Sequence, residues 1–266
     1  MRGITGIDHP VIAVRDLGSA RMTFERLGFA ISGRGTHLEW GTGNCCIMFP
    51  KGYLELVGIV DSTRYTHGLD EFLNMREGLV GIALSTESAD RACHDLAAAG
   101  IGVEPVREVT RNMETPTGFC QPRFRVCFLD RAGVPGLPST AICQHLTPEL
   151  LRHADWLKHP NGATGIVSIT LPVPSLEAAT SAYRALFGQD MVSCTPTSSE
   201  IRMENGTMIR LVSGRRTEEL KLAVESLACV QMWLGDSRVP FLMLPDGGVQ
   251  VQSEHGCGVI TNFVEQ

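Results

Sequence analysis

Residues 5–20 read TGIDHPVIAVRDLGSA, and residues 164–179 repeat this stretch without a gap as TGIVSITLPVPSLEAA. The first half of each copy is apolar and β-branched, which is typical of a strand. From the second half onward, apolar residues recur at spacings of three, four and three, which indicates one buried face of a helix. These residues are Leu17, Ala20, Phe24 and Leu27 in the first copy and Leu176, Ala179, Tyr183 and Leu186 in the second.

Three short strand patterns follow each predicted helix. In the first copy they are predicted at 29–35, 43–50 and 52–60. Two weaker copies of the same order, strand, helix and three strands, begin near residues 79 and 220. Because a single unit leaves an open sheet edge that invites aggregation, we expect the units to pair side by side. The sequence therefore predicts an α+β fold in which four βαβββ units pair into two curved mixed sheets, each with a concave face.

The joint between the two pairs has the signals of a short helix. Thr147 is a suitable N-terminal cap, Pro148 suits the first helical position, and HPNGA ends the segment. We therefore expect a first domain at 1–146, a linker helix at 147–163 and a second domain at 164–266.

Composition limits the class of function. The chain has 266 residues, of which 43% are hydrophobic and 20% charged, and its net charge of −6 contains no basic block. These values argue against a nucleic-acid or membrane surface, and the N-terminus lacks a signal-peptide pattern. The nine cysteines have no CxxC spacing, which favours reduced thiols in a cytoplasmic protein.

A histidine and a glutamate are predicted to face each other in the first unit. His9 lies on the first strand, and Glu55 shares one face of the fourth strand with Tyr53 and Val57. A carboxylate in an apolar strand is costly without a partner. Imidazole and carboxylate together suit a divalent metal such as Zn, Mn, Fe or Ni. The second copy has Ser168 in place of His9, so this chemistry is expected in the first pair alone.

Four stretches carry a family resemblance: GIDHPVIAVRDLGSARMTFERLGF, WGTGN, YLELVGI and QHLTPEL…HPNGATGI. They resemble the vicinal oxygen chelate superfamily, and more narrowly bacterial proteins with a glyoxalase-like domain. The resemblance implies a metal site that takes one first-strand and one fourth-strand residue from each paired unit. It also implies a fold that hosts isomerases, lyases, extradiol dioxygenases and binding proteins.

Carried over by position, this pattern gives an incomplete metal site. The first unit supplies His9 and Glu55. In the second unit the matching positions are Gly81, which has no side chain, and Gln144, with His145 in its place if the strand register shifts by one residue. The resemblance thus implies the ligands His9, Glu55 and Gln144.

In the second pair the corresponding positions do not form a metal site. They are occupied by Ser168, Arg210, Val224 and Asn262 or their neighbours. We therefore interpret residues 164–266 as a degenerate glyoxalase-like domain.

Four further residues are candidates for substrate binding. His37, Trp40 and Asn44 lie in the stretch RGTHLEWGTGN, although its glycines are equally typical of a simple turn. Arg125 lies in the alternating strand RFRVCF and would clamp an anionic group if its face is concave, or face solvent if it is not. His67 is expected at the surface.

We expect a glyoxalase-like, metal-dependent enzyme, of the isomerase or lyase type, that acts on a small molecule with vicinal oxygens. Glu55 is the candidate for moving a proton. One alternative is a non-catalytic binding or sequestering protein of the bleomycin-resistance type, and another is an extradiol-type dioxygenase. Open sheet edges are compatible with a monomer or a homodimer.

Overall fold

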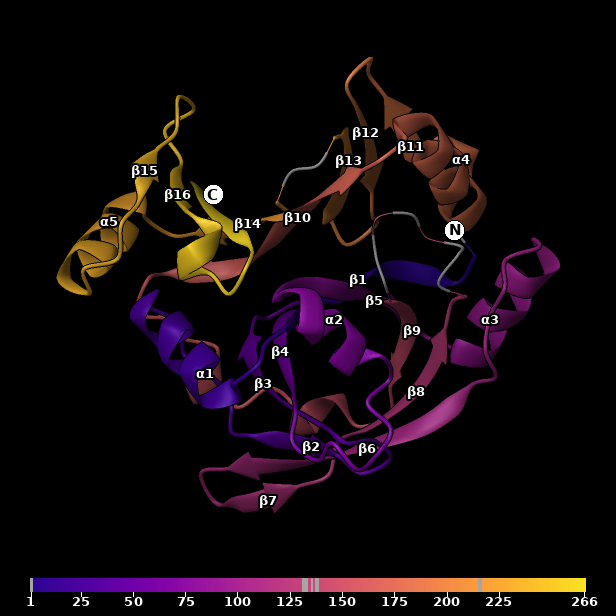
Figure 1. Cartoon of the computed structure of the whole chain (residues 1–266), viewed down its shortest axis with the longest axis horizontal. Helices are drawn as coiled ribbons and strands as arrows, with labels where there is room; N and C mark the ends of the chain where they lie inside the picture. Colours follow the sequence, from indigo (N-terminus) through magenta and orange to yellow (C-terminus); the bar gives the residue numbers. More distant parts are fainter. Residues whose placement is uncertain (1, 131–133, 135, 137–138, 215–216) are drawn as a thin grey trace.

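The structure is a computed structural model and describes residues 2–130, 134, 136, 139–214 and 217–266. Among them, the N-terminal sheet has nine strands in the order β2-β3-β4-β1-β5-β9-β8-β6-β7, and β2 also pairs with β6. This extra pairing closes the sheet into the barrel seen in the lower half of Figure 1. The strands are β1 (Ile4–Ala13), β2 (Gly35–His37), β3 (Thr42–Met48), β4 (Tyr53–Ile59), β5 (Gly78–Thr86), β6 (Arg107–Thr115), β7 (Gly118–Cys120), β8 (Arg123–Phe128) and β9 (Ser139–His145).

The C-terminal sheet repeats this order but has no such closing pair among its described strands. Its order is β11-β12-β13-β10-β14-β17-β16-β15. The strands are β10 (Ala163–Val173), β11 (Val192–Cys194), β12 (Ser198–Arg202), β13 (Met208–Ser213), β14 (Glu219–Val224), β15 (Leu242–Met243), β16 (Val249–Val251) and β17 (Ile260–Glu265). In both sheets the first strands of two units pair antiparallel at the centre, and each pairs in parallel with the fourth strand of its own unit. The predicted fold of four βαβββ units in two curved mixed sheets is confirmed.

Each unit contributes one amphipathic helix with a side-chain cap. The helices are α1 (Leu17–Arg26), α3 (Ala89–Ala98), α4 (Leu176–Phe187) and α5 (Leu227–Asp236). In each, an Asp or Ser side chain at the N-cap accepts a hydrogen bond from a backbone N–H of the first turn. The expected linker helix is reduced to two 3-10 turns, Pro148–Leu150 and Ala154–Trp156.

Three elements of the barrel differ from the predicted ones. The strand expected at 29–35 is found at Gly35–His37, and the short strand β7 was not predicted. The helix α2 (Leu69–Met75) was also missed, since its seven residues are too few to show a helical period. Its Leu69, Phe72 and Leu73 pack on Val57 over one part of the barrel.

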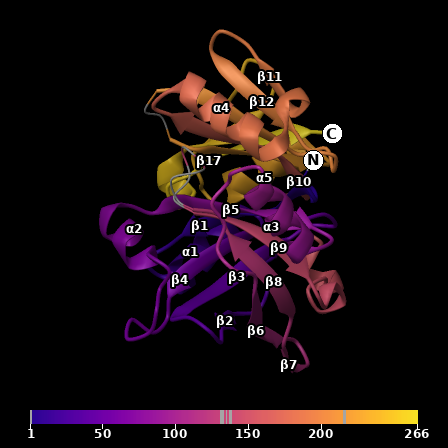
Figure 2. The same ribbon diagram turned by 90° about the vertical axis from the view of Figure 1, so that its right-hand side faces the viewer.

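The two halves are stacked, with the C-terminal sheet above the barrel in Figure 2. Arg76 donates to both carboxylate oxygens of Glu218 at 2.6 and 3.1 Å, and the Trp233 indole N–H donates to the Arg26 carbonyl at 3.1 Å. One apolar core runs through both halves. None of the helices in the described part of the chain has the length and apolar character needed to span a bilayer.

The expectation of reduced thiols throughout is wrong for one pair of cysteines. Cys93 on α3 and Cys127 on β8 are joined in a disulfide. The two residues are 34 positions apart, so local cysteine spacing could not predict this disulfide. The helix packs over its own unit's third strand, and this contact brings the two sulfur atoms together.

Candidate functional site

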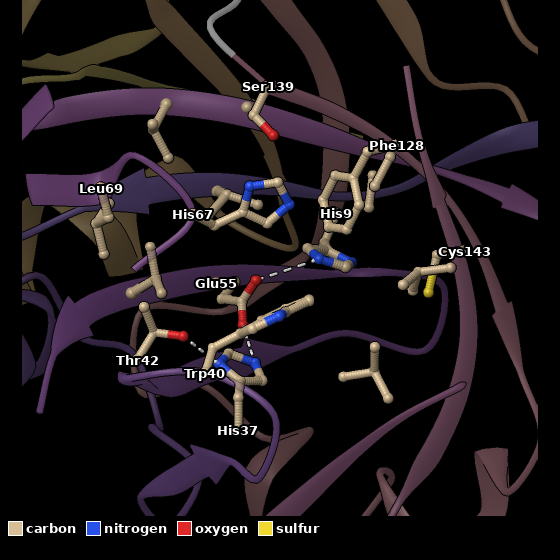
Figure 3. A pocket seen from close by; sticks show the side chains of 18 of the residues that line it. His9, His37, Trp40, Thr42, Glu55, His67, Leu69, Phe128, Ser139 and Cys143 are labelled. Atoms are coloured by element: carbon tan, nitrogen blue, oxygen red, sulfur yellow. Dashed lines mark hydrogen bonds and ion pairs between the residues drawn. The ribbon is translucent and has the colours of Figure 1, made fainter. Parts of the chain in front are cut away.

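The barrel contains a cavity of about 150 Å³ that is open to solvent on one side. Most of its wall is apolar and includes Val11, Val57, Ile82, Val126 and Phe128. Polar side chains gather at one end of it, where Figure 3 shows a histidine on either side of a carboxylate. A concave apolar pocket with a few converging polar groups is the usual form of a small-molecule site.

His9 is fixed in this polar end by two carboxylates. A register shift in β1 between Ile7 and His9 lets the consecutive residues Asp8 and His9 contact each other, with Nδ1 of His9 2.7 Å from Oδ2 of Asp8. Nε2 of His9 lies 3.3 Å from Oε2 of Glu55, and the ring stacks on Tyr53 at 4.1 Å. Burial alone would lower the pKa of His9, but its hydrogen bonds and charge interactions with Asp8 and Glu55 raise it to about 9.

Glu55 receives hydrogen bonds on one oxygen and faces His9 with the other. Oε1 accepts from Nδ2 of Asn44 and, at 3.2 Å, from Nη2 of Arg111. Burial alone would raise the pKa of Glu55, but the hydrogen bond from His9 and the charge of Arg111 hold it well below its usual range. Glu55 is therefore ionised at neutral pH, and Oε2 is the oxygen that remains for a ligand.

His37 directs its second nitrogen at the same carboxylate. Nδ1 lies 2.8 Å from the hydroxyl of Thr42, and Nε2 lies 3.8 Å from Oε1 of Glu55. The Trp40 ring lies beside it, 5.4 Å away between ring centroids. Burial lowers the pKa of His37 to about 4, so its imidazole is neutral at pH 7.

Arg111 is a central residue that the sequence analysis missed. Its side chain is 4% exposed and its guanidinium lies over the ring of Phe124, 5.3 Å from the centroid. Val109, Arg111 and Met113 share the buried face of β6. The sequence does show Arg111 on the same strand face as the apolar residues Val109 and Met113. This pattern alone does not identify a site residue, because Arg111 comes beside Glu55 only through the pairing of β6 with β2.

The second unit supplies no donor at the positions equivalent to His9 and Glu55. Val11 pairs with Glu55 in the first unit, and the equivalent pair in the second unit is Ala83 with Ala141. Ala141 therefore occupies the place that the sequence analysis gave to Gln144. Gly81 lines the cavity at the other position.

The register of β9 points Gln144 away from the cavity. Its Oε1 accepts a hydrogen bond from the backbone N–H of Ala89 at the start of α3. His145 is on the same face as Cys143, and its Nε2 lies 2.9 Å from Oδ2 of Asp8. The observed register is therefore the alternative one, in which His145 takes the inward position in place of Gln144. The local pattern of AICQHL leaves the register of this strand open, because the register is set by the pairing of β9 with β5.

The remaining candidates divide between the cavity and the surface. His37, Trp40 and Asn44 gather around Glu55 as described. Arg125 forms an ion pair with Asp90 on the outer side of β8, whose cavity face carries Phe124, Val126 and Phe128. His67, expected at the surface, lines the cavity with its ring 4.1 Å from that of Phe128.

Gly81 cannot be replaced by the missing ligand without strain. A Cβ atom there would lie 2.5 Å from the backbone oxygen of Ser139 on the neighbouring strand. We expect Gly81→Ala to destabilise the protein by about 1–3 kcal/mol, because strand β9 must shift to admit the methyl group. Urea unfolding measures this loss, and Gly165→Ala, where a Cβ would meet nothing within 4 Å, is the control. Equal effects of the two variants would show that close packing at Ser139 is not the reason for glycine.

The donors around Glu55 fit a divalent metal. Two ligands of one cation at bond lengths of about 2.0–2.2 Å lie roughly 3 Å apart, close to the 3.3 Å between Nε2 of His9 and Oε2 of Glu55. Nε2 of His37 faces the other oxygen of Glu55, Oε1, at 3.8 Å and lies 3.4 Å from Nδ2 of Asn44, so His9 and Glu55 alone provide the converging donors. Asp8 holds the opposite nitrogen of the His9 ring, as partners of metal-binding histidines do. Beside this set, Asp8, Cys143 and His145 form a group whose ligand atoms all lie within 4.8 Å, which can also hold a metal ion.

The shifted histidines predict how stability depends on pH in the presence of a chelator. The raised pKa of His9 stabilises the fold fully below pH 6.5, and this contribution, on the order of 3 kcal/mol, is lost as pH rises from 6.5 to 9. The lowered pKa of His37 has the opposite effect, because the unfolded chain takes up a proton between pH 6.5 and 4 that the folded chain does not. Urea unfolding across this range should show both limbs. We expect His9→Gln to remove the loss of unfolding free energy between pH 6.5 and 9, and His37→Gln to remove the loss between pH 6.5 and 4. A pH dependence that persists in these variants would contradict the assignment.

Comparison with known proteins agrees with this architecture. Residues 7–187 match the family model described as a glyoxalase-like domain, and no curated protein matches the chain. A hypothetical protein from Staphylococcus aureus has a similar structure, with a TM-score of 0.75 and 13% identity over 98% of this chain and 99% of that one. A triple mutant of 4-hydroxymandelate synthase from Streptomyces coelicolor has a TM-score of 0.65 and 11% identity over 99% and 93% of the two chains.

A third similar structure is a fusion of a xylose isomerase-like TIM barrel with 4-hydroxyphenylpyruvate dioxygenase. Its TM-score is 0.66 at 14% identity, over 98% of this chain and 48% of the fusion. At these low identities the three structures establish that the fold is shared, but they say nothing about whether the reaction is shared. The family match spans more than half of the sequence and includes both His9 and Glu55. The chain therefore belongs to the glyoxalase-like domain family.

Proposed function

We propose that the barrel cavity is the active site of a metal-dependent enzyme, of the isomerase or lyase type, whose small substrate carries two adjacent oxygen atoms. The observation that carries this proposal is the convergence of His9 Nε2 and Glu55 Oε2 on one point at the polar end of an otherwise apolar cavity. Burying an imidazole and a carboxylate is costly unless they have partners, and here both converge on the cavity.

His9 and Glu55 would hold the cation, which supplies a Lewis acid for oxygens that become negatively charged in the reaction. The chain's own groups prepare this site. Arg111 and Asn44 keep Glu55 ionised and fix its orientation. As an ionised carboxylate, Glu55 is able to accept a proton from the substrate but has none to give at the start of a cycle.

The cavity limits the size and character of the substrate. A cavity of about 150 Å³ is large enough for a molecule of the size of benzene. Its apolar wall, with Val11, Val57 and Phe128, favours a hydrocarbon body. The substrate class that fits is a short-chain or single-ring compound with vicinal oxygens, such as a dicarbonyl, a hydroxy acid or a catechol.

Incubation with such compounds tests the proposal. Metal-loaded protein should convert at least one of them, with the product followed by NMR, and a His9→Ala, Glu55→Gln variant should not. The positions of Gly81 and Ala141, which carry no donor, favour a second candidate, a binding protein without chemistry. Saturable binding of a compound with unchanged NMR spectra after long incubation, with and without metal, would favour that second candidate.

A further inference from the structure

A second group of metal-binding side chains lies on the other side of His9 from Glu55. It comprises Asp8 on β1 and Cys143 and His145 on β9, whose ligand atoms all lie within 4.8 Å of one another. Asp8 is 8% exposed and Cys143 4%. The strands β1 and β9 are not neighbours, since β5 lies between them. Opposite His9, β5 presents the small Ala83, which leaves room for Asp8 to reach across to β9.

The chemistry of this group differs from that of the group around Glu55. A thiol, an imidazole and a carboxylate are the ligands that zinc takes in proteins, and a thiolate selects against Mg²⁺ and Mn²⁺. With one thiolate and one carboxylate, a bound Zn²⁺ is neutral overall, which suits a buried position. Three protein ligands leave one position open, and Cys143 borders the cavity (Figure 3).

We propose that Asp8, Cys143 and His145 form a separate zinc site in the wall of the cavity. Binding replaces the proton of the Cys143 thiol by the metal and releases that proton to solvent. In the structure Oδ2 of Asp8 contacts both Nδ1 of His9 and Nε2 of His145, and with zinc bound Asp8 would hold the metal with one oxygen and His9 with the other. The site shares with the proposed active site Asp8, which orients His9, and Cys143, which borders the cavity, but it does not rest on that function.

Cobalt distinguishes the two sites, because a Co²⁺–thiolate bond absorbs in the near ultraviolet and bonds to nitrogen and oxygen do not. We expect metal-stripped protein titrated with Co²⁺ to develop this absorption at one equivalent. Cys143→Ser should abolish the band, and Asp8→Asn and His145→Ala should weaken Co²⁺ binding at least 10-fold. Circular dichroism verifies that each variant is folded.

Two controls separate this proposal from the proposed function. Cys45→Ser removes another buried free thiol outside the cluster and should leave the band unchanged. His9→Ala with Glu55→Gln removes the donors around Glu55 and should also keep the band, whether or not turnover survives. No thiolate band in the wild-type protein, or a band that persists in folded Cys143→Ser, would overturn the proposal.

Discussion

Replacing His9 with alanine is expected to weaken divalent metal binding at the Glu55 end of the cavity by at least about 100-fold and to remove turnover. Loss of a partner that merely orients a ligand costs 10–100-fold in affinity, and loss of a ligand costs at least the upper end of that range. The remaining donor, Glu55, then lacks the nitrogen that lies 3.3 Å from its Oε2.

Competition with a chelating dye for Mn²⁺ measures this affinity, because Mn²⁺ avoids the thiolate of the proposed zinc site. His94→Ala removes an exposed histidine of α3 and serves as the matched control. Unchanged Mn²⁺ affinity in His9→Ala would show that the cation, if any binds, is held elsewhere.

Replacing Arg111 with methionine is expected to destabilise the protein by about 3–5 kcal/mol. The side chains of Arg111 and Glu55 are 4% and 7% exposed, and removing one partner of a buried pair leaves the other as an uncompensated charge. Urea unfolding measures the loss. Arg125→Met is the control, because its ion pair with Asp90 is on the surface and contributes at most about 1 kcal/mol.

A second substitution distinguishes this electrostatic effect from a loss of packing. In Arg111→Met the Glu55 carboxylate is the source of the cost, so adding Glu55→Gln should restore a large part of the lost stability. If the two substitutions simply add, the guanidinium stabilises the barrel through its contacts with Tyr53 and Phe124 instead.

The repeat at 5–20 and 164–179 was sufficient to predict the fold because strand and helix periods are local properties of a sequence. The same alternation placed Glu55 on the cavity face of β4 opposite His9. The closing of the barrel was not predictable in this way. It depends on the pairing of β2 with β6, residues more than 70 positions apart, and this pairing brings Arg111 to Glu55.

Register was the second property that the sequence did not determine. One step along β9 exchanges Gln144, which binds the first turn of α3, for His145, which binds Asp8. Both residues are compatible with the local pattern, and the choice is made by hydrogen bonds to β5. The cluster of Asp8, Cys143 and His145 could not be predicted either, because it also depends on the register of β9.

The most direct test of the active site is the position of bound manganese. Crystals grown with Mn²⁺ and measured at a wavelength where it scatters anomalously should show a peak within about 2–2.5 Å of both His9 Nε2 and Glu55 Oε2. A peak at that position would establish the metal centre on which the proposed reaction depends. Crystals with no peak there, in which Glu55 contacts His9 and Arg111 directly despite saturating Mn²⁺, would contradict it.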